Sequence, residues 1–414
     1  MQAVFEETVI LSVIGIVGEY NPFHFGHKYH IEQSIRTLGT ACPVVCVMSG
    51  DFVQRGEAAV YSKFARAEAA VKSGVDLVLE LPVPWSLSSA EGFARGAVGL
   101  LGALGVVTHL SFGSECGETE PLCRVAELLL DPTFMGDVRR ELDNDEGISF
   151  AAARQRAALK RIGAEAELLS APNNILAVEY IKSIYALGLD MAPMTVERVG
   201  AGHDGVSAGG PKSAAELRRA LAAGSSLTGA IPEKAYDIYR REERLGRGPV
   251  LPERLETAML SRLRMLPDSA FAALPDAGEG LCNRLAAAVR SESSIDAVLA
   301  ASKSKRYALS RIRRMTVCAA LGIKSGDAEG LPPYARVLAA NERGCALLRD
   351  IGERTSLPVI TKPAAVKQLE PEARRIFTLG SAAHDLYVLG YSSKEERKGS
   401  EDWRTSPKIV RNGD

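Results

Sequence analysis

The chain has 414 residues, 46% of them hydrophobic, which is long enough for two or three domains with sizeable cores. Its formal net charge of −1 excludes a global attraction to nucleic acid or membranes, so any polyanion must bind through a local basic patch. The seven cysteines lack CxxC spacing, which indicates reduced thiols. The sequence has neither a basic leader nor a run of about 18 apolar residues. We therefore expect a cytoplasmic protein without membrane contact.

Short apolar runs alternate with helical segments over the first part of the chain. The runs are residues 9–18, 43–50, 75–83 and 106–115. This alternation is typical of βαβ units with buried parallel strands. Residues 119–190 are expected to be mainly helical, and 194–200 to add one more strand. The fold class is therefore α/β, with a Rossmann-like parallel sheet.

The pattern changes after residue 228, where helical segments separated by Pro and Gly dominate. We predict a Rossmann-like domain over residues 1–228 and a mainly helical domain over 229–392. Residues 393–414 are charged and poor in apolar side chains, so they cannot bury enough surface to offset the entropy of ordering. A disordered tail is expected there.

Three of the six histidines, His24, His27 and His30, lie three residues apart. The first apolar run ends at Gly18 and leads through EYNPFHFGH into a helix, which places the imidazoles near a helix N-terminus at the carboxyl edge of the sheet. Gly26 would let a ligand approach the backbone, and imidazole N–H donors would stabilise charge on a phosphate. The alternatives are surface histidines and a zinc site, although the HExxH motif and a nearby cysteine are absent from the sequence.

Small and polar residues follow the second expected strand. Ser49 and Asp51 flank a glycine there, and backbone N–H groups at such a strand end bind phosphate or carboxylate, although a simple turn favours the same residues. Lys63 and Arg66 begin the next helix, where a cation gains nothing from the helix dipole. Neutralisation of a ligand's charge is the alternative to simple solvation for these two.

Two later helix starts are also candidates. Asn173 or Asn174 is expected to cap the helix in APNNILAVEY, which leaves the other free for a second role. Ser213 is expected to be an N-cap, with Glu216 in the capping-box position.

The segment KSKRYALSRIRR carries six cations and no acid: Lys303, Lys305, Arg306, Arg311, Arg313 and Arg314. Wound as a helix, it would present Lys303, Arg306 and Arg313 on one side, as a ladder along a phosphate backbone. Tyr307 would stack on an unpaired base. The alternative is a solvated charged face.

Several of these segments carry a family resemblance. HFGH matches the HxGH signature of the HIGH-type nucleotidyltransferases. Together with VMSGDFVQRGEAAVYSKFARAEAAVKSGVDLVLELP, FGSECG and PNNILAVEYIKS, it resembles the bacterial tRNA(Met) cytidine acetate ligases, from Val13 to Gly390. The resemblance implies an enzyme that uses ATP, with Mg²⁺ accompanying it, to activate acetate as acetyl-adenylate. The acetyl group would then pass to N4 of the wobble cytidine of elongator tRNA(Met).

The resemblance also implies roles for residues. Catalysis is expected from His24, His27, Ser49 and Asp51, and tRNA binding from the six cations above. ATP binding is expected from Val17, Gly18, Glu19, Tyr20, Asn21, Pro22, Phe23, His24, Gly26, His27, His30, Gly113, Asn173, Asn174, Arg198, Ser213 and Arg218. KSAAELRRAL resembles the (S/T)xxxIR phosphate-binding segment of the superfamily, with alanines at 214 and 215 and leucine before Arg218 as departures; a plain capped surface helix is the alternative.

No protein-held metal site is expected. Two other functions stay open: a nucleotidyltransferase that makes a small nucleotide-containing cofactor, and a non-catalytic RNA-binding protein.

Overall fold

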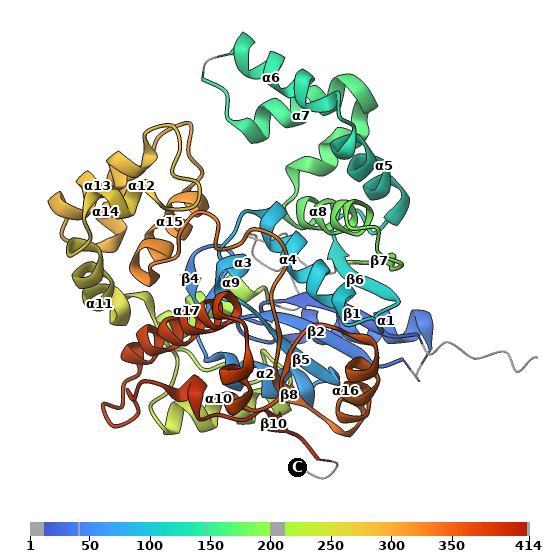
Figure 1. Cartoon of the computed structure of the whole chain (residues 1–414), viewed down its shortest axis with the longest axis vertical. Coiled ribbons are helices and arrows are strands. Elements are labelled where there is room, and N and C mark those ends of the chain that lie inside the picture. The colour runs from blue at the N-terminus through green and yellow to red at the C-terminus, as the bar shows by residue number, and fades with distance from the viewer. Residues whose placement is uncertain (1–11, 40–41, 146, 199–211, 412–414) are drawn as a thin grey trace, which may run out of the picture.

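The computed structural model describes residues 12–39, 42–145, 147–198 and 212–411, and its centre is one sheet with helices on both faces (Figure 1). The sheet has eight strands in the order β10-β8-β5-β2-β1-β6-β7, with β9 paired to β8. These strands are β1 (Ile14–Gly18), β2 (Val44–Ser49), β5 (Leu77–Leu81), β6 (His109–Ser114), β7 (Ala192–Glu197), β8 (Ala335–Ala340), β9 (Val359–Ile360) and β10 (Lys408–Ile409). A separate hairpin joins β3 (Phe52–Val53) to β4 (Glu57–Ala58).

The five strands expected from the apolar runs are present and pair in parallel. Ile14 lies opposite both Val44 and His109, so β1 lies in the middle of the parallel part of the sheet. Its carboxyl end therefore opens between the ends of β2 and β6, where parallel sheets bind ligands. The α/β prediction is confirmed.

Helices cover both faces of the sheet, as their buried side chains show. One face carries α4 (Ala90–Ala103), α8 (Pro172–Ala186) and α16 (Glu342–Arg354). The other carries α1 (Phe25–Leu38), α2 (Lys63–Lys72), α9 (Ala214–Ala222) and α10 (Glu233–Arg244). Strands buried on both sides explain why the runs are apolar at nearly every position.

Two helical parts extend from this core (Figure 1). An arm packs on α8 and consists of α5 (Thr119–Leu130), α6 (Phe134–Asn144), α7 (Phe150–Ile162) and η1 (Gly163–Ser170). A second hydrophobic cluster is built by α3 (Val83–Ser86), α11 (Pro252–Arg264), α12 (Asp268–Ala272), α13 (Leu281–Ser291), α14 (Ile295–Ser302), α15 (Leu309–Leu321), α17 (Pro371–Tyr387) and η3 (Val388–Gly390). The turn η2 (Pro363–Gln368) follows β9. No helix among the described residues is long and apolar enough to span a membrane.

The expected boundary at residue 228 is wrong. Helix α10, which follows it, packs on α2, and β8 lies beside β5 in antiparallel orientation. The segment 229–392 therefore builds the helical cluster and also completes the sheet. The run ARVLAA of β8 is buried at every position and is apolar except for Arg336. It stands alone among helices, so the alternation of strands and helices gave no signal for it.

The expected disorder of the tail is also wrong for the described part of it. Residues Glu401–Trp403 form the turn η4, and β10 pairs with β8. Asp402 is completely buried in ion pairs, and Val410 inserts into the core beside β8. Because buried ion pairs and backbone pairing order this segment, its low apolar content gave the wrong expectation.

Candidate active site

The turn from β1 to α1 fixes the orientation of two imidazoles. His24 is the N-cap of α1, and its Nδ1 accepts the N–H of Gly26 at 3.0 Å. Nδ1 of His27 accepts the N–H of His24 at 3.2 Å. Since a neutral imidazole has one donor and one acceptor, both rings carry their proton on Nε2. The rings stack with their centroids 3.8 Å apart, so the two N–H donors lie side by side at the start of the helix.

These histidines are neutral at ordinary pH. Burial, together with the charges of Arg198 and Arg218, lowers the pKa of His24 to about 3. Burial and Arg198 lower the pKa of His30 to about 4, and burial followed by the charges of His24, Arg198 and His30 lowers that of His27. His30 contacts Ser111 Oγ of β6 at 2.8 Å. The described residues hold no group of three or more His, Cys, Asp or Glu able to bind a metal ion.

The loop before α1 is shaped by buried side chains. Tyr20, Asn21, Pro22 and Phe23 are buried, so their side chains face the protein interior. Asn21 Oδ1 accepts the N–H of Val60, and the Phe23 N–H donates to the hydroxyl of Tyr239. These residues therefore set the path of the loop, and the partly exposed Val17, Gly18 and Glu19 form its open edge.

Gly26 has a structural role in this turn. A Cβ at this position would lie 2.8 Å from Cε1 of His24. Glycine thus makes room for the His24 ring to turn back and cap the helix.

Arg66 joins the carboxyl ends of β1 and β2. Its buried guanidinium donates to the carbonyl oxygens of Glu19 at 2.5 Å, Ser49 at 3.2 Å, and Gly50. Burial raises the pKa of the Glu19 carboxyl, although a bond from the Gln54 N–H and nearby arginines oppose this effect. Arg66 therefore holds the two strand ends below the site. Direct contact with a ligand was one of its two expected roles, but the full burial of its side chain does not fit that role.

Asp51 is bound on both oxygens. Oδ1 accepts the N–H of Lys63 at 2.8 Å, and Oδ2 contacts Nδ1 of His384 at 2.8 Å. The Lys63 ammonium is buried between Glu80 at 2.8 Å and Asp402 at 2.7 Å, so it is not available to a ligand. Ser49 is also buried, and its Oγ has no hydrogen-bond partner among the described residues.

Sequence reasoning missed His384, which contacts Asp51 and is itself bound by Glu401. It also missed two members of the buried cluster around Lys63 and Glu80, which are Asp402 and Arg336. The last two pair at 2.9 Å. One signal was available: His384 recurs with the apolar positions Phe377 and Ala373 at intervals of seven and four along α17, which indicates a buried face.

Glu115 occupies the N-terminus of α8. Its carboxylate accepts the N–H groups of Asn173 at 3.1 Å and Asn174 at 2.7 Å, and the Asn173 amide donates to it at 2.6 Å. Asn174 Oδ1 accepts the N–H of Glu115 in return. The expectation that an asparagine caps this helix is wrong, because Ala171 is the N-cap and both asparagines lie inside the first turn.

Arg198 and Arg218 approach the histidine turn from two other elements. Arg198 follows β7, its N–H bonds Ser114 O at 3.0 Å, and a Cβ on Gly113 would lie 3.2 Å from its Cγ. Gly113 thus leaves space for the Arg198 side chain beside β6. Arg218 on α9 donates to Asn21 O at 3.0 Å.

The predicted capping box of α9 is confirmed. Ser213 is the N-cap, its Oγ accepts the N–H of Glu216, and the Glu216 carboxylate bonds back to Ser213.

The basic run does not form the expected helical ladder. Helix α14 ends at Ser302 and α15 begins at Leu309, so Lys303, Lys305 and Arg306 lie in an exposed turn between them. Tyr307 is buried, and its hydroxyl donates to Glu279 O, which leaves its ring unavailable to a base.

Arg311, Arg313 and Arg314 each pair with an acid of another element. Arg313 donates to Glu57 at 2.6 Å, Arg314 is buried beside Asp276, and Arg311 bonds Glu279 at 3.1 Å. Arg218 also lies 3.9 Å from Glu57. The hairpin β3–β4 therefore connects α15 to α9.

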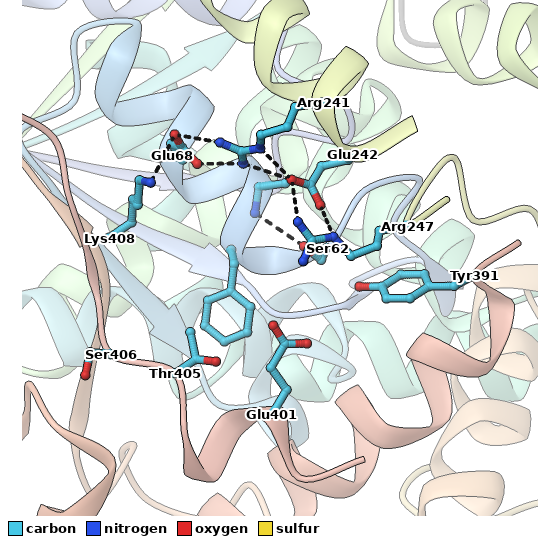
Figure 2. Close-up of a pocket in the computed structure, with 12 residues that line it drawn as sticks. Ser62, Glu68, Arg241, Glu242, Arg247, Tyr391, Glu401, Thr405, Ser406 and Lys408 are labelled. Atoms are coloured by element: carbon cyan, nitrogen blue, oxygen red, sulfur yellow. Dashed lines mark hydrogen bonds and ion pairs between the residues drawn. The ribbon is translucent and has the colours of Figure 1, made fainter. Parts of the chain in front are cut away.

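The lining of a pocket of about 240 Å³ does not include His24, His27 or His30 (Figure 2). It opens between α2, α10 and the C-terminal segment, and its lining includes Ser62, Arg241, Glu242, Arg247 and Glu401. Its arginines are paired with glutamates, Arg241 with Glu68 and Arg247 with Glu242. None of the residues expected to bind ATP lines it.

Comparisons with known proteins agree with this geometry. The family model described as HIGH Nucleotidyl Transferase matches residues 11–402. The chain is 34% identical to the tRNA(Met) cytidine acetate ligase of Acetivibrio thermocellus, over 95% of this chain and 98% of that protein. It is 38% identical to the protein of the same name from Caldanaerobacter subterraneus, over 92% and 96% of the two chains.

Solved structures from Thermotoga maritima are similar as well. The apo form of TmcAL superimposes with a TM-score of 0.92 at 33% identity, covering 97% of this chain and all of that one. The form bound with alpha-thio ATP gives a TM-score of 0.89 with the same identity and coverage.

Proposed function

Since the chain belongs to the tRNA(Met) cytidine acetate ligases, a family of HIGH nucleotidyltransferases, we propose that it activates acetate with ATP and acetylates the wobble cytidine of elongator tRNA(Met). In the first half-reaction an acetate oxygen attacks the α-phosphate of ATP, and pyrophosphate leaves. In the second, N4 of the cytidine attacks the acetyl carbonyl, AMP leaves, and the nitrogen loses a proton. We place the enzyme in the cytoplasm, where its tRNA substrate is found.

The paired Nε2–H donors of His24 and His27 carry this proposal. Charge builds on the non-bridging oxygens as acetate attacks the α-phosphate, and donors fixed before the reaction stabilise that charge without reorganising. Both rings are neutral, so they add hydrogen bonds and no net charge. We assign the cationic contribution to Arg198 and Arg218, together with Mg²⁺ that accompanies the phosphates of ATP.

The other predicted ATP contacts divide into two groups. The first group is partly exposed and is proposed to line the nucleotide: Val17, Gly18, Glu19, Gly26, His30, Gly113, Asn173 and Ser213. Tyr20, Asn21, Pro22, Phe23 and Asn174 are buried and are proposed to hold the backbone that the nucleotide meets. Ser49 is completely buried, as Arg66 is, so we propose that it supports the loop beside the ligand.

The exposed turn with Lys303, Lys305 and Arg306 is proposed to contact tRNA phosphates. Such contacts are electrostatic and position the RNA, and the single-stranded anticodon loop lets the cytidine leave its stack at low cost. Arg311, Arg313 and Arg314 are proposed to support this turn through their bonds to the neighbouring hairpin and loop.

The test is nucleoside mass spectrometry of tRNA after incubation with the purified protein, ATP and isotopically labelled acetate. Labelled N4-acetylcytidine that requires ATP is the expected product. Pyrophosphate release with a nucleotide-containing small molecule, and no label in RNA, would favour a cofactor-forming nucleotidyltransferase. Binding of tRNA without ATP turnover would favour an RNA-binding protein.

A further inference from the structure

We propose that His384 is a positioning residue for acetate activation, and that the C-terminal segment 399–410 keeps it in place. The inference rests on the proposed function, because it concerns the first half-reaction of that ligase. His384 lies on α17, far along the chain from the histidine turn, and it touches neither of the two imidazoles described above. It acts through Asp51.

Both ring nitrogens of His384 contact carboxylates. Nδ1 lies 2.8 Å from Asp51 Oδ2, and Nε2 lies 2.9 Å from Glu401 Oε2. An imidazole donates from both nitrogens only when it is protonated, so this geometry requires the imidazolium form. The ring is completely buried, with the edge of Phe64 against it.

This contact fixes the loop that ends β2. Asp51 is held by His384 on one oxygen and by the Lys63 N–H on the other. The two preceding carbonyls, of Ser49 and Gly50, are held by Arg66, which also holds Glu19 O at the end of β1. Movement of Asp51 would therefore shift the edge at which acetate and the α-phosphate are proposed to meet.

The loop is also tightly packed on its other side. A Cβ on Gly50 would lie 2.8 Å from Oε1 of Glu80, whose carboxylate pairs with Lys63 and Arg336. The loop is thus enclosed between α2, β5 and α17, and His384 supplies the contact from α17.

Several ionisable groups lie on the elements around His384. They are Asp51 after β2, Lys63 on α2, Glu80 on β5, Arg336 on β8, Tyr387 at the end of α17, Tyr391 after η3, and Glu401 and Asp402 on η4. Burial opposes the imidazolium, but Asp51 and Glu401 outweigh burial and raise the pKa of His384 to about 10. The contact therefore persists throughout the neutral range.

The segment 399–410 supplies the second carboxylate and is itself anchored. Asp402 is buried between Lys63 and Arg336, the Ser400 N–H donates to Asp385 at 2.6 Å, and the Val410 N–H donates to Ala340 O. Glu401 lines the pocket of Figure 2, and its side chain is 34% exposed. Substitution of Glu401 therefore alters His384 without opening a cavity in the core.

The experiment uses the full-length protein without tRNA and measures exchange of labelled pyrophosphate into ATP as a function of acetate. The variants are Glu401→Gln and His384→Gln, and the matched control is Glu396→Gln. This control removes a nearby exposed carboxylate whose one ion pair within the described ranges is with Arg247, at 3.7 Å. We expect Glu401→Gln to raise KM for acetate by about tenfold or more, because a displaced loop misplaces the reacting groups. ATP affinity should stay at the wild-type value.

The pH profile separates positioning from simple stability. Without the Glu401 charge the pKa of His384 falls, so the exchange rate of the variant should decline at a lower alkaline pH than that of the wild type. A variant that is folded but has wild-type KM and an unchanged alkaline limb would overturn the proposal, even if its Tm is lower. If His384→Gln does not fold, Glu401→Gln alone decides. A wild-type protein without acetate-dependent exchange would instead contradict the proposed function.

Discussion

The imidazole rings of His24 and His27 stack 3.8 Å apart, and each accepts a backbone N–H at Nδ1. The capping box of α1 is therefore made by two histidines in place of the usual serine and glutamate. One set of contacts starts the helix and also directs both Nε2–H groups outward. Helix capping and the proposed stabilisation of phosphate charge thus depend on the same two side chains.

A pair of variants distinguishes the two roles of His24, which are helix capping and the proposed stabilisation of phosphate charge. Asparagine accepts the Gly26 N–H as an N-cap but does not place a donor where Nε2 lies, whereas alanine removes both functions. We expect His24→Asn to lower acetate-dependent pyrophosphate exchange by about 10²-fold or more with little change in Tm. His24→Ala should lose similar activity and also about 1 kcal/mol of stability.

Rates and melting curves measured side by side check this prediction. If His24→Asn retains full exchange activity, the histidine serves only as a cap. If both variants have the same Tm as the wild-type protein, the cap makes no measurable contribution to stability.

The buried histidines predict how stability depends on pH. His24 and His30 have pKa values lowered to about 3 and about 4, and that of His27 is lowered as well, whereas the unfolded chain titrates near about 6.5. Below about pH 6.5 the unfolded state thus binds more protons, so stability falls as the pH falls. His384 acts in the opposite direction, since its raised pKa gives stability that is lost as the pH rises towards about 10.

His30→Gln isolates one of these groups, since glutamine still reaches towards Ser111. Denaturant unfolding between pH 4.5 and 7 should show that the free energy of unfolding of this variant falls less steeply with falling pH than that of the wild type. The difference between the two slopes should correspond to the uptake of less than one proton on unfolding. The carboxylates contribute equally to both proteins and cancel in the difference. Parallel slopes would show that folding does not lower the pKa of His30.

Much of the site follows from the sequence because it is local. The motif HFGH lies directly between an apolar strand and an amphipathic helix, and this order alone places His24 and His27 at the carboxyl edge of the sheet. The capping box of α9 is local as well, since Ser213 and Glu216 are three residues apart.

The remaining features depend on contacts between distant segments. The residues around Asp402 have the composition of a disordered tail. Only folding brings Asp402 to Lys63, which is 339 residues away in the sequence. The prediction of a cationic ladder over residues 303–314 is wrong for a similar reason, because Glu57 and Asp276 neutralise Arg313 and Arg314 from other elements. Charge along the chain does not show which cations already have partners.

Removal of the Asp402 carboxylate should destabilise the fold. Its Oδ2 lies 2.7 Å from Lys63 Nζ and 2.9 Å from Arg336, and all three groups are buried. Loss of one member of a buried ion cluster leaves charge uncompensated, so we expect Asp402→Ala to lower the free energy of unfolding by about 3–5 kcal/mol. Urea denaturation measures it, with Glu396→Gln as the control from the same segment. A loss no larger than that of the control would mean that Glu80 alone satisfies both cations.

The exposed turn before α15 should determine the salt dependence of tRNA binding. Lys305→Ala with Arg306→Ala removes two exposed cations from this turn, and each lost phosphate contact lowers the slope of log K against log salt by about 0.7–0.9. We therefore expect weaker binding at low salt, a shallower slope, and unchanged pyrophosphate exchange. Filter binding over a series of salt concentrations gives both the affinity and the slope.

Arg349→Ala is the matched control, because it removes an exposed cation from α16, on the opposite side of the sheet from α1. Its affinity and slope should equal those of the wild type. Arg314→Ala should act differently again, by lowering Tm, because its guanidinium is buried beside Asp276. If the double variant binds tRNA with the wild-type slope, the turn is a solvated surface, and the RNA must meet cations elsewhere on the protein.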